Sequence, residues 1–154
     1  MKVIFLDVDG VLNDSSTDDR TPNGFIGLSS IMINNLKTVV DATGACVVLT
    51  STWKSEWDKN ADNRNVDGAY LHDTLLSHGI CISDKTEDQM SNRGFGIISY
   101  LKEHPEIDKW VVLDDDVFFD YKEHGIMDHL VRTRFGFGGL TTELAKLAIA
   151  KLNE

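Results

Sequence analysis

Three runs of apolar residues, each followed by polar side chains, limit what this chain can fold into more than any other feature. The runs are KVIFLD (2–7), ACVVLT (45–50) and KWVVLDDD (109–116). A strand that is covered on both faces shows such a continuous run, and strands of this kind are typical of parallel sheets. The three runs therefore predict inner strands of a parallel sheet.

Segments with helical periodicity separate these runs. The segment 29–44 begins with a serine cap, has apolar residues three and four positions apart, and ends in a glycine. Further helices are expected at 66–78, 93–104 and 140–152, and further strands near 79–83 and at 129–133. Strands that alternate with helices are typical of an α/β fold. We therefore expect a three-layer, doubly wound, Rossmann-like sheet.

Length and composition fit one ordinary globular unit. The chain has 154 residues, of which 42% are hydrophobic and 26% charged. This length suits a single core, so we expect one domain over residues 1–154. The first residues show neither a basic leader nor a long apolar stretch, which favours a cytoplasmic protein with no membrane partner.

The charge balance is acidic, with 15 Lys and Arg against 25 Asp and Glu and a net charge of −10. Such a charge repels phosphate polymers on average and disfavours nonspecific nucleic-acid binding. Carboxylates that hold a divalent cation would add to this count without describing the outer surface. A local basic patch is also compatible with it, so charge alone does not identify the substrate.

Polar side chains follow three of the predicted strands at the point where each strand ends. These are Asp7, Thr50 and Asp114. Ligands of open parallel sheets bind beyond the carboxyl ends of the strands, so these side chains should converge on one site. Clustered carboxylates stay ionised together only with a cation between them, and hard oxygen ligands suit magnesium. The sequence therefore predicts a Mg²⁺ site at this edge of the sheet.

The same residues resemble the motifs of the haloacid dehalogenase (HAD) superfamily. DVDGVLN (7–13) resembles the first motif, VVLTSTW (47–53) the second and VVLDDD (111–116) the acidic fourth. Arg93 stands where the basic residue of the third motif could lie, and Lys85 is a competitor for that position. The resemblance covers nearly the whole chain. It implies a HAD-type hydrolase that acts on phosphoester bonds with magnesium as cofactor.

Within the superfamily, the chain looks most like the HAD domain of Swiss Army Knife RNA repair proteins. This narrower resemblance rests on LTSTWK (49–54), on Thr86 and an Arg-Gly pair (93–94) before a predicted helix, on LDDD (113–116) and on a late GLT (139–141). It implies a phosphatase whose substrate is a nucleic-acid terminal phosphate.

The superfamily resemblance also implies a catalytic role for each motif residue. Asp7 would be the nucleophile that forms an aspartyl-phosphate. Asp9 would protonate the leaving oxygen and later take a proton from the attacking water. Thr50 would donate its hydroxyl to a phosphoryl oxygen, and Ser51 would donate its backbone N–H. Arg93 would offset charge on the transferring group.

Four aspartates are the expected metal ligands. Asp114 would bind Mg²⁺ directly, and Asp115 would bind it through water. The carboxylate of Asp7 and the backbone carbonyl of Asp9 would contribute from the first motif, as the resemblance implies.

Two residues after the second motif are candidates for substrate binding. Lys54 could meet a second phosphate, and Trp53 could stack on a base or sugar. The alternative for Trp53 is packing as a lid over the sheet edge.

The chain has no room for a separate cap domain. The connections 12–28 and 83–92 are too short for an independent core, although 54–70 could form a partial lid. Capless members of the superfamily often act on extended substrates, so a phosphorylated nucleic-acid end or a nucleotide is the expected partner. A phosphoprotein or a small phosphoester stays open. The alternative function is a catalytically weak HAD-like module that binds magnesium and phosphate.

Overall fold

The computed structural model describes residues 1–88 and 91–154. Within them five strands form one parallel sheet in the order β3-β2-β1-β4-β5. The strands are β1 (Lys2–Leu6), β2 (Cys46–Leu49), β3 (Ile82–Lys85), β4 (Lys109–Asp114) and β5 (Leu130–Arg132). The helices are α1 (Ser30–Thr43), α2 (Val66–Ser77), α3 (Arg93–Glu103) and α4 (Thr142–Asn153). The predicted doubly wound α/β fold is confirmed.

The strand predicted near 79–83 begins later in the structure, at Ile82. Gly79 adopts a left-handed conformation (φ 79°), and the N–H of Ile80 donates to the carbonyl of Leu75. This hydrogen bond closes the end of α2 and uses the residues that the apolar pattern suggested for the strand.

Register places the ends of three strands side by side. Leu6 at the end of the central strand pairs with Leu49 on β2 and with Leu113 on β4. The next N–H groups continue this pairing, since Asp7 donates to the carbonyl of Leu113 (2.9 Å) and Thr50 donates to that of Leu6 (2.8 Å). The polar residues that follow β1, β2 and β4 therefore emerge at the same level.

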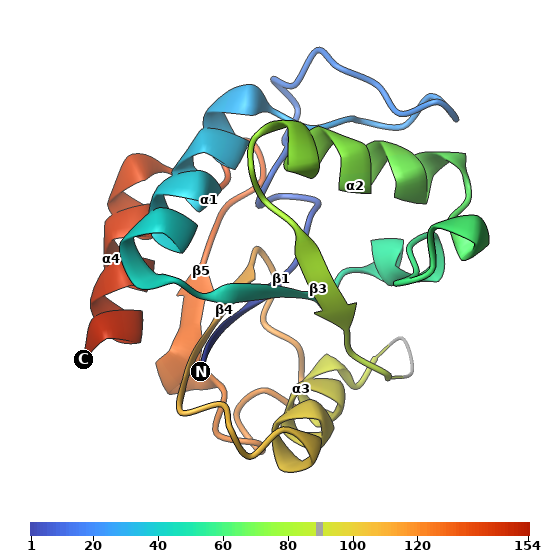
Figure 1. Ribbon diagram of the computed structural model, residues 1–154. Helices are drawn as coiled ribbons and strands as arrows, with labels where there is room; N and C mark the ends of the chain where they lie inside the picture. The colour runs from blue at the N-terminus through green and yellow to red at the C-terminus, as the bar shows by residue number, and fades with distance from the viewer. Residues whose placement is uncertain (89–90) are drawn as a thin grey trace.

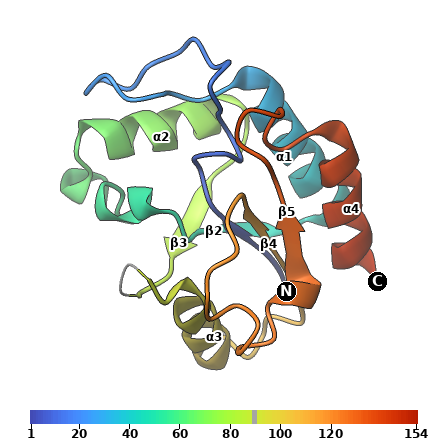
Figure 2. The ribbon, with the colours of Figure 1, turned by 180° about the vertical axis from the view of Figure 1, so that it is seen from behind.

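Side chains alternate between the two faces of the sheet. Ile4 and Leu6 point into a core shared with α1, α2 and α4, whereas Val3 and Phe5 point into a second core shared with α3. Figures 1 and 2 show α1 beside α4 on one side of the sheet, with α3 alone on the other. The continuous apolar runs follow from this arrangement, because every side chain of a central strand is covered.

Connections between the elements stay close to the domain. The segment 54–70 contains a short 3₁₀ helix (Ala61–Asn63) and the first turn of α2, and Trp57 anchors it at 1% exposure. No separate cap domain is formed by the described residues. The predicted connection 83–92 contains positions 89–90, which lie outside them.

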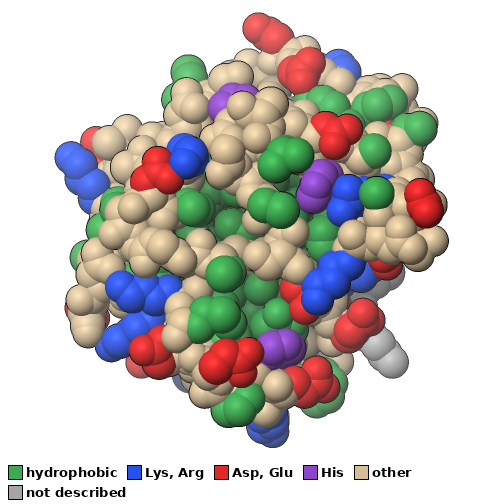
Figure 3. Space-filling view, viewed as in Figure 1, with side chains coloured by type: hydrophobic (Ala, Val, Ile, Leu, Met, Phe, Trp, Pro, Cys, Tyr) green, Lys and Arg blue, Asp and Glu red, His purple; other side chains and the backbone are tan. Residues whose placement is uncertain are grey.

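Charged side chains of both signs are interspersed on the face seen in Figure 3, and apolar groups gather toward its centre. No described helix combines the length and the apolar character needed to cross a membrane.

The second core supports a prediction about stability. Phe5 is fully buried and meets Tyr100 and Trp110 edge to face, with ring centroids 5.8 and 5.9 Å away. We expect Phe5→Ala to lower the free energy of unfolding by about 3–5 kcal/mol, because it leaves a cavity. The same change at Phe119, which is 76% exposed, should cost less than about 0.5 kcal/mol. Urea denaturation of both variants measures the difference, and equal losses would contradict this packing.

Candidate active site

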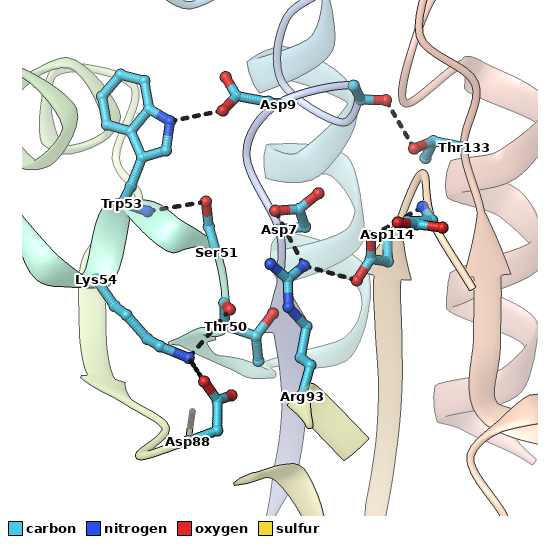
Figure 4. Close-up of polar contacts among 12 residues, drawn as sticks. Asp7, Asp9, Thr50, Ser51, Trp53, Lys54, Asp88, Arg93, Asp114 and Thr133 are labelled. Carbon is cyan, nitrogen blue, oxygen red and sulfur yellow. Dashed lines mark hydrogen bonds and ion pairs between the residues drawn. The ribbon is translucent and has the colours of Figure 1, made fainter. Parts of the chain in front are cut away.

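A buried guanidinium faces two carboxylates at the ends of the strands. Arg93 Nη1 lies 3.3 Å from Asp7 Oδ1 and 2.8 Å from Asp114 Oδ2 (Figure 4). All three residues are at least nine-tenths buried. The contact joins the first residue of α3 to the residue that follows β1 and to the last residue of β4, so segments far apart in sequence meet here.

Neighbouring groups fix the position of Arg93. Asp120, itself buried, accepts hydrogen bonds from the backbone N–H groups of Gly94 (3.1 Å) and Phe95 (2.9 Å) and so holds the first turn of α3. The ring of Phe118 lies 4.2 Å from the guanidinium carbon. The helix start and the aromatic ring together aim this cation at the strand ends.

Both carboxylate oxygens of Asp114 accept hydrogen bonds. One of its oxygens accepts hydrogen bonds from Arg93 and from the hydroxyl of Tyr121 (2.7 Å), and the other accepts from the N–H of Asp116 (3.0 Å). A carboxylate so fully bonded cannot swing. The side chain of Asp114 therefore has a fixed position in the site.

Three carboxylates form a cluster that suits a divalent cation. Oxygen atoms of Asp7, Asp114 and Asp115 all lie within 4.8 Å of one another. Burial, and after it the charge of Asp114, raises the pKa of Asp7 well above its usual range, and Arg93 offsets part of this. Burial and Asp114 also raise the pKa of Asp115. One guanidinium thus leaves the cluster short of positive charge, and hard oxygen ligands fit a cation such as Mg²⁺.

Asp9 lies apart from this cluster. Its carboxylate accepts hydrogen bonds from the indole N–H of Trp53 (3.0 Å) and from the amide of Asn13 (2.9 Å). Gly10, with a left-handed φ of 81°, turns the chain directly after it. Asp9 thereby faces an open pocket of about 490 Å³ that Trp53 and Phe25 also line. Two carboxylates of one motif occupy two different environments.

Thr50 and Lys54 approach the cluster from β2 and the segment after it. The hydroxyl of Thr50 is buried and has no hydrogen-bond partner among the described residues. Lys54 Nζ lies 2.5 Å from Asp88 and 3.4 Å from the carbonyl oxygen of Thr50. Burial lowers the pKa of Lys54. The free hydroxyl of Thr50 and the ammonium group of Lys54 could both donate hydrogen bonds to the oxygens of a phosphoryl group.

Comparison with known proteins bears on this geometry. A family model described as the HAD domain in Swiss Army Knife RNA repair proteins matches residues 3–145. The chain belongs to this family. Membership makes it a HAD-type phosphohydrolase, and the resemblance seen in the motifs is confirmed.

Among solved structures, this HAD domain is similar to the cobalt-bound deoxy-D-mannose-octulosonate 8-phosphate phosphatase of Haemophilus influenzae. The identity is 18%, the TM-score is 0.47, and the match covers 99% of this chain and 88% of the other. The comparison with curated proteins yields no match.

Some of the predicted site residues meet in the structure and others do not. Arg93 reaches the carboxylates, whereas the competing Lys85 donates to the carbonyl oxygens of Lys54 (3.0 Å) and Trp57 (2.8 Å) and lies elsewhere. The side chain of Ser51 accepts from the N–H of Trp53 (3.2 Å), so it caps the turn after β2.

Several residues of the site carried no recognisable signal in the sequence. Tyr121, Asp120 and Asp88 come from loops without a motif, and Asn13 closes the DVDGVLN stretch without an assigned role. Trp53 is 8% exposed and uses its indole N–H on Asp9, a contact that neither reading of this residue foresaw.

Gly10 provides a test of the loop geometry. A Cβ there would lie 2.2 Å from Asp115 Oδ2, whereas a Cβ at Gly24, also left-handed with φ 90°, meets nothing within 4 Å. Gly24→Ala should cost only the left-handed strain, about 1–2 kcal/mol, and Gly10→Ala about 1–3 kcal/mol more because of the clash. Thermal unfolding of both variants measures this. Equal losses would contradict the close approach of Asp115.

The carboxylate cluster predicts stabilisation by metal. At a Mg²⁺ concentration of about 100 times its Kd, the free energy of unfolding should rise by roughly 2.7 kcal/mol, since the folded site alone binds the ion. Asp115→Asn should lose most of the accompanying rise in Tm. Asp116→Asn, an exposed neighbour outside the cluster, should keep it. Calorimetry with and without Mg²⁺ checks both variants, and a rise retained in Asp115→Asn would rule out this site.

Proposed function

We propose that this HAD domain is a Mg²⁺-dependent phosphatase that works through an aspartyl-phosphate on Asp7, with terminal phosphates of nucleic acids or nucleotides as substrates. One observation carries the proposal. The carboxylate of Asp7 lies 3.3 Å from a buried guanidinium within the acidic cluster, whereas that of Asp9 stands outside it and faces the open pocket. Separate environments suit a nucleophile and an acid–base group.

In the first step, an Asp7 oxygen attacks phosphorus and the bond from phosphorus to the ester oxygen breaks. The new bond is the acyl-phosphate linkage to Asp7. Asp9 gives its proton to the departing ester oxygen, so the leaving group departs as an alcohol. The pocket that Asp9 lines receives this alcohol.

In the second step, water attacks the phosphorus of the aspartyl-phosphate and Asp9 takes the proton of that water. Inorganic phosphate leaves and the Asp7 carboxylate is restored. Trp53 (3.0 Å) and Asn13 (2.9 Å) each donate a hydrogen bond to one oxygen of Asp9 and hold its side chain in place. They also keep its oxygens aimed at the pocket.

Other groups offset charge on the transferring phosphoryl group. Arg93 lies beside Asp7, Thr50 has an unused hydroxyl, and the backbone N–H of Ser51 follows in the chain. Lys54 would meet the same phosphate or a neighbouring one. Asp7, Asp114, Asp115 and the backbone carbonyl of Asp9 would hold Mg²⁺, which supplies positive charge to the phosphoryl oxygens when it is bound.

The substrate class rests on access and on family. The described residues form no cap, and the pocket beside Asp9 is open, so a long leaving group can extend from the site. The matching family is named for RNA repair proteins. Both points favour a phosphorylated nucleic-acid end over a small metabolite.

Substitution of the two aspartates tests the mechanism. Asp7→Asn should abolish phosphate release from p-nitrophenyl phosphate, because the amide cannot attack phosphorus. Asp9→Asn should slow turnover by roughly 10²–10⁴-fold, since acid–base catalysis is lost in both steps. Asp116→Asn serves as the charge-matched control and should keep its activity.

Phosphate release from mononucleotides, oligonucleotides with 3′ or 5′ phosphate, and phosphopeptides, measured with added Mg²⁺, identifies the substrate class. A protein that binds Mg²⁺ yet hydrolyses none of them would be a binding module instead of an enzyme. Full activity in Asp7→Asn would end the aspartyl-phosphate mechanism.

A further inference from the structure

An exposed aromatic turn lies next to the candidate active site. It spans 133–139, and it presents Phe135 and Phe137 to solvent at 44% and 77% exposure. Phe25, at 67% exposure, stands on the loop before α1 and lines the same pocket as Phe135. Each ring forgoes the stabilisation that burial would bring, and such a group of exposed rings at a site marks a binding surface.

The turn is held rigidly against the loop that carries the catalytic motif. Thr133 Oγ1 donates to the carbonyl oxygen of Gly10 (2.7 Å), and the N–H of Gly138 donates to the carboxylate of Asp14 (3.0 Å). Figures 1 and 2 show the two loops side by side, and Figure 4 shows the contact of Thr133. The exposed rings are therefore fixed in place before any ligand arrives.

Two arginines, one on each side of Thr133, carry uncompensated charge near the start of this turn. Arg132 and Arg134 are exposed, and among the described residues neither forms an ion pair within 4.0 Å. Arg132 donates one hydrogen bond, to the backbone carbonyl of Asp115 (3.3 Å). In a chain with a net charge of −10, two unpaired guanidinium groups beside a site are a local positive patch.

Three hollows adjoin one another beside the candidate active site. The hollow of about 270 Å³ is lined by Arg93, by Lys54 and by Asp88, the ion-pair partner of Lys54. It shares Thr52 and Ser55 with the pocket that contains Asp9. That pocket, of about 490 Å³, is lined mainly by apolar and aromatic groups and has carboxylates but no cation.

The third hollow, of about 380 Å³, contains Asp115, Arg132, Arg134 and Phe137 and shares Phe135 with the Asp9 pocket. A hollow with Lys54 and Arg93, a pocket without a cation, and a hollow with Arg132 and Arg134 therefore adjoin in this order. A nucleotide chain alternates in the same way between phosphates and uncharged nucleosides.

We propose that the hollow formed by Arg132, Arg134, Phe135 and Phe137 binds the second nucleotide of a single-stranded nucleic acid whose phosphorylated end lies at Asp7. The terminal nucleoside fills the pocket beside Asp9. The arginines contact the next phosphodiester, and the exposed rings stack on the next base. This inference rests on the proposed phosphatase function and adds where the strand runs and why length matters.

The chemistry of the hollow favours a nucleic acid over a phosphopeptide. Stacking needs flat rings in the ligand, which every nucleotide has and few peptide residues have. Arginine forks match phosphate oxygens and add salt-dependent affinity without sequence preference. The pocket beside Asp9 has apolar walls, carboxylates and no cation, so it takes an uncharged sugar and base and repels further negative charge.

Length dependence of hydrolysis tests the proposal. KM and kcat are measured for a mononucleotide, a dinucleotide and a hexanucleotide, each bearing the same terminal phosphate, with p-nitrophenyl phosphate as the generic phosphoester. The KM of the dinucleotide should be roughly 5- to 100-fold lower than that of the mononucleotide, as expected for one stacked base.

Variants of the turn separate stacking from charge. Phe137→Ala should remove most of the dinucleotide preference and leave mononucleotide hydrolysis unchanged. Arg134→Ala should do the same and lower the slope of log KM against log salt by about 0.7, the value for one phosphate contact on a single strand. Arg134→Lys should keep the slope. Phe119→Ala and Lys146→Ala, exposed changes outside the three hollows, are the matched controls.

The outcomes separate this inference from the proposed function. Hydrolysis of p-nitrophenyl phosphate with equal KM for all lengths would overturn the second-nucleotide site and leave the phosphatase standing. A length preference that survives in Phe137→Ala and Arg134→Ala would overturn it too, as would a phosphopeptide hydrolysed as well as the dinucleotide. Failure to hydrolyse any phosphoester would end both.

Discussion

Three carboxylates crowd the end of the sheet, and one buried guanidinium compensates them only in part. Asp7, Asp114 and Asp115 lie close enough to share a cation, and Arg93 reaches two of them. Burial makes each negative charge more unfavourable, so the cluster persists only where the surrounding structure holds it. The strand register, the capped start of α3 and the hydroxyl of Tyr121 all serve this arrangement.

Both faces of the sheet contribute to the site. Arg93 arrives with α3 from one face, whereas the loop after β1 is held against the turn after β5 by Thr133 and Gly138. The chain turns at Gly10, directly after Asp9. One carboxylate therefore stays among charges inside the domain while the other faces an open, apolar pocket.

Cations beside the site would allow this acidic chain to accept the nucleic-acid end that we propose as substrate. Net charge acts as an average, but a ligand at the site meets the local field. Lys54 and Arg93 lie on one side of the Asp9 pocket, and Arg132 and Arg134 lie beyond it. Part of the acidic count belongs to the carboxylate cluster, where a cation would neutralise it.

The sequence by itself determined the fold class, the three inner strands and the residues that follow them. Buried strands need continuous apolar runs, and parallel topology carries the residues after them to one edge, so Asp7, Thr50 and Asp114 could be placed in advance. The apolar runs are local patterns, and the general topology of parallel sheets connects them. The motif DVDGVLN and the acidic LDDD also identified the superfamily from the chain alone.

Only the tertiary structure decided which side chains meet. The sequence favoured Arg93 over the competing Lys85 only narrowly. In the structure, Asp120 holds the first turn of α3 so that Arg93 meets Asp7, while Lys85 bonds to backbone carbonyls. The contact of Trp53 with Asp9 and the rigid aromatic turn likewise join segments distant in sequence. Such contacts depend on rotamers and loop paths that the whole packed domain sets, and no local pattern encodes them.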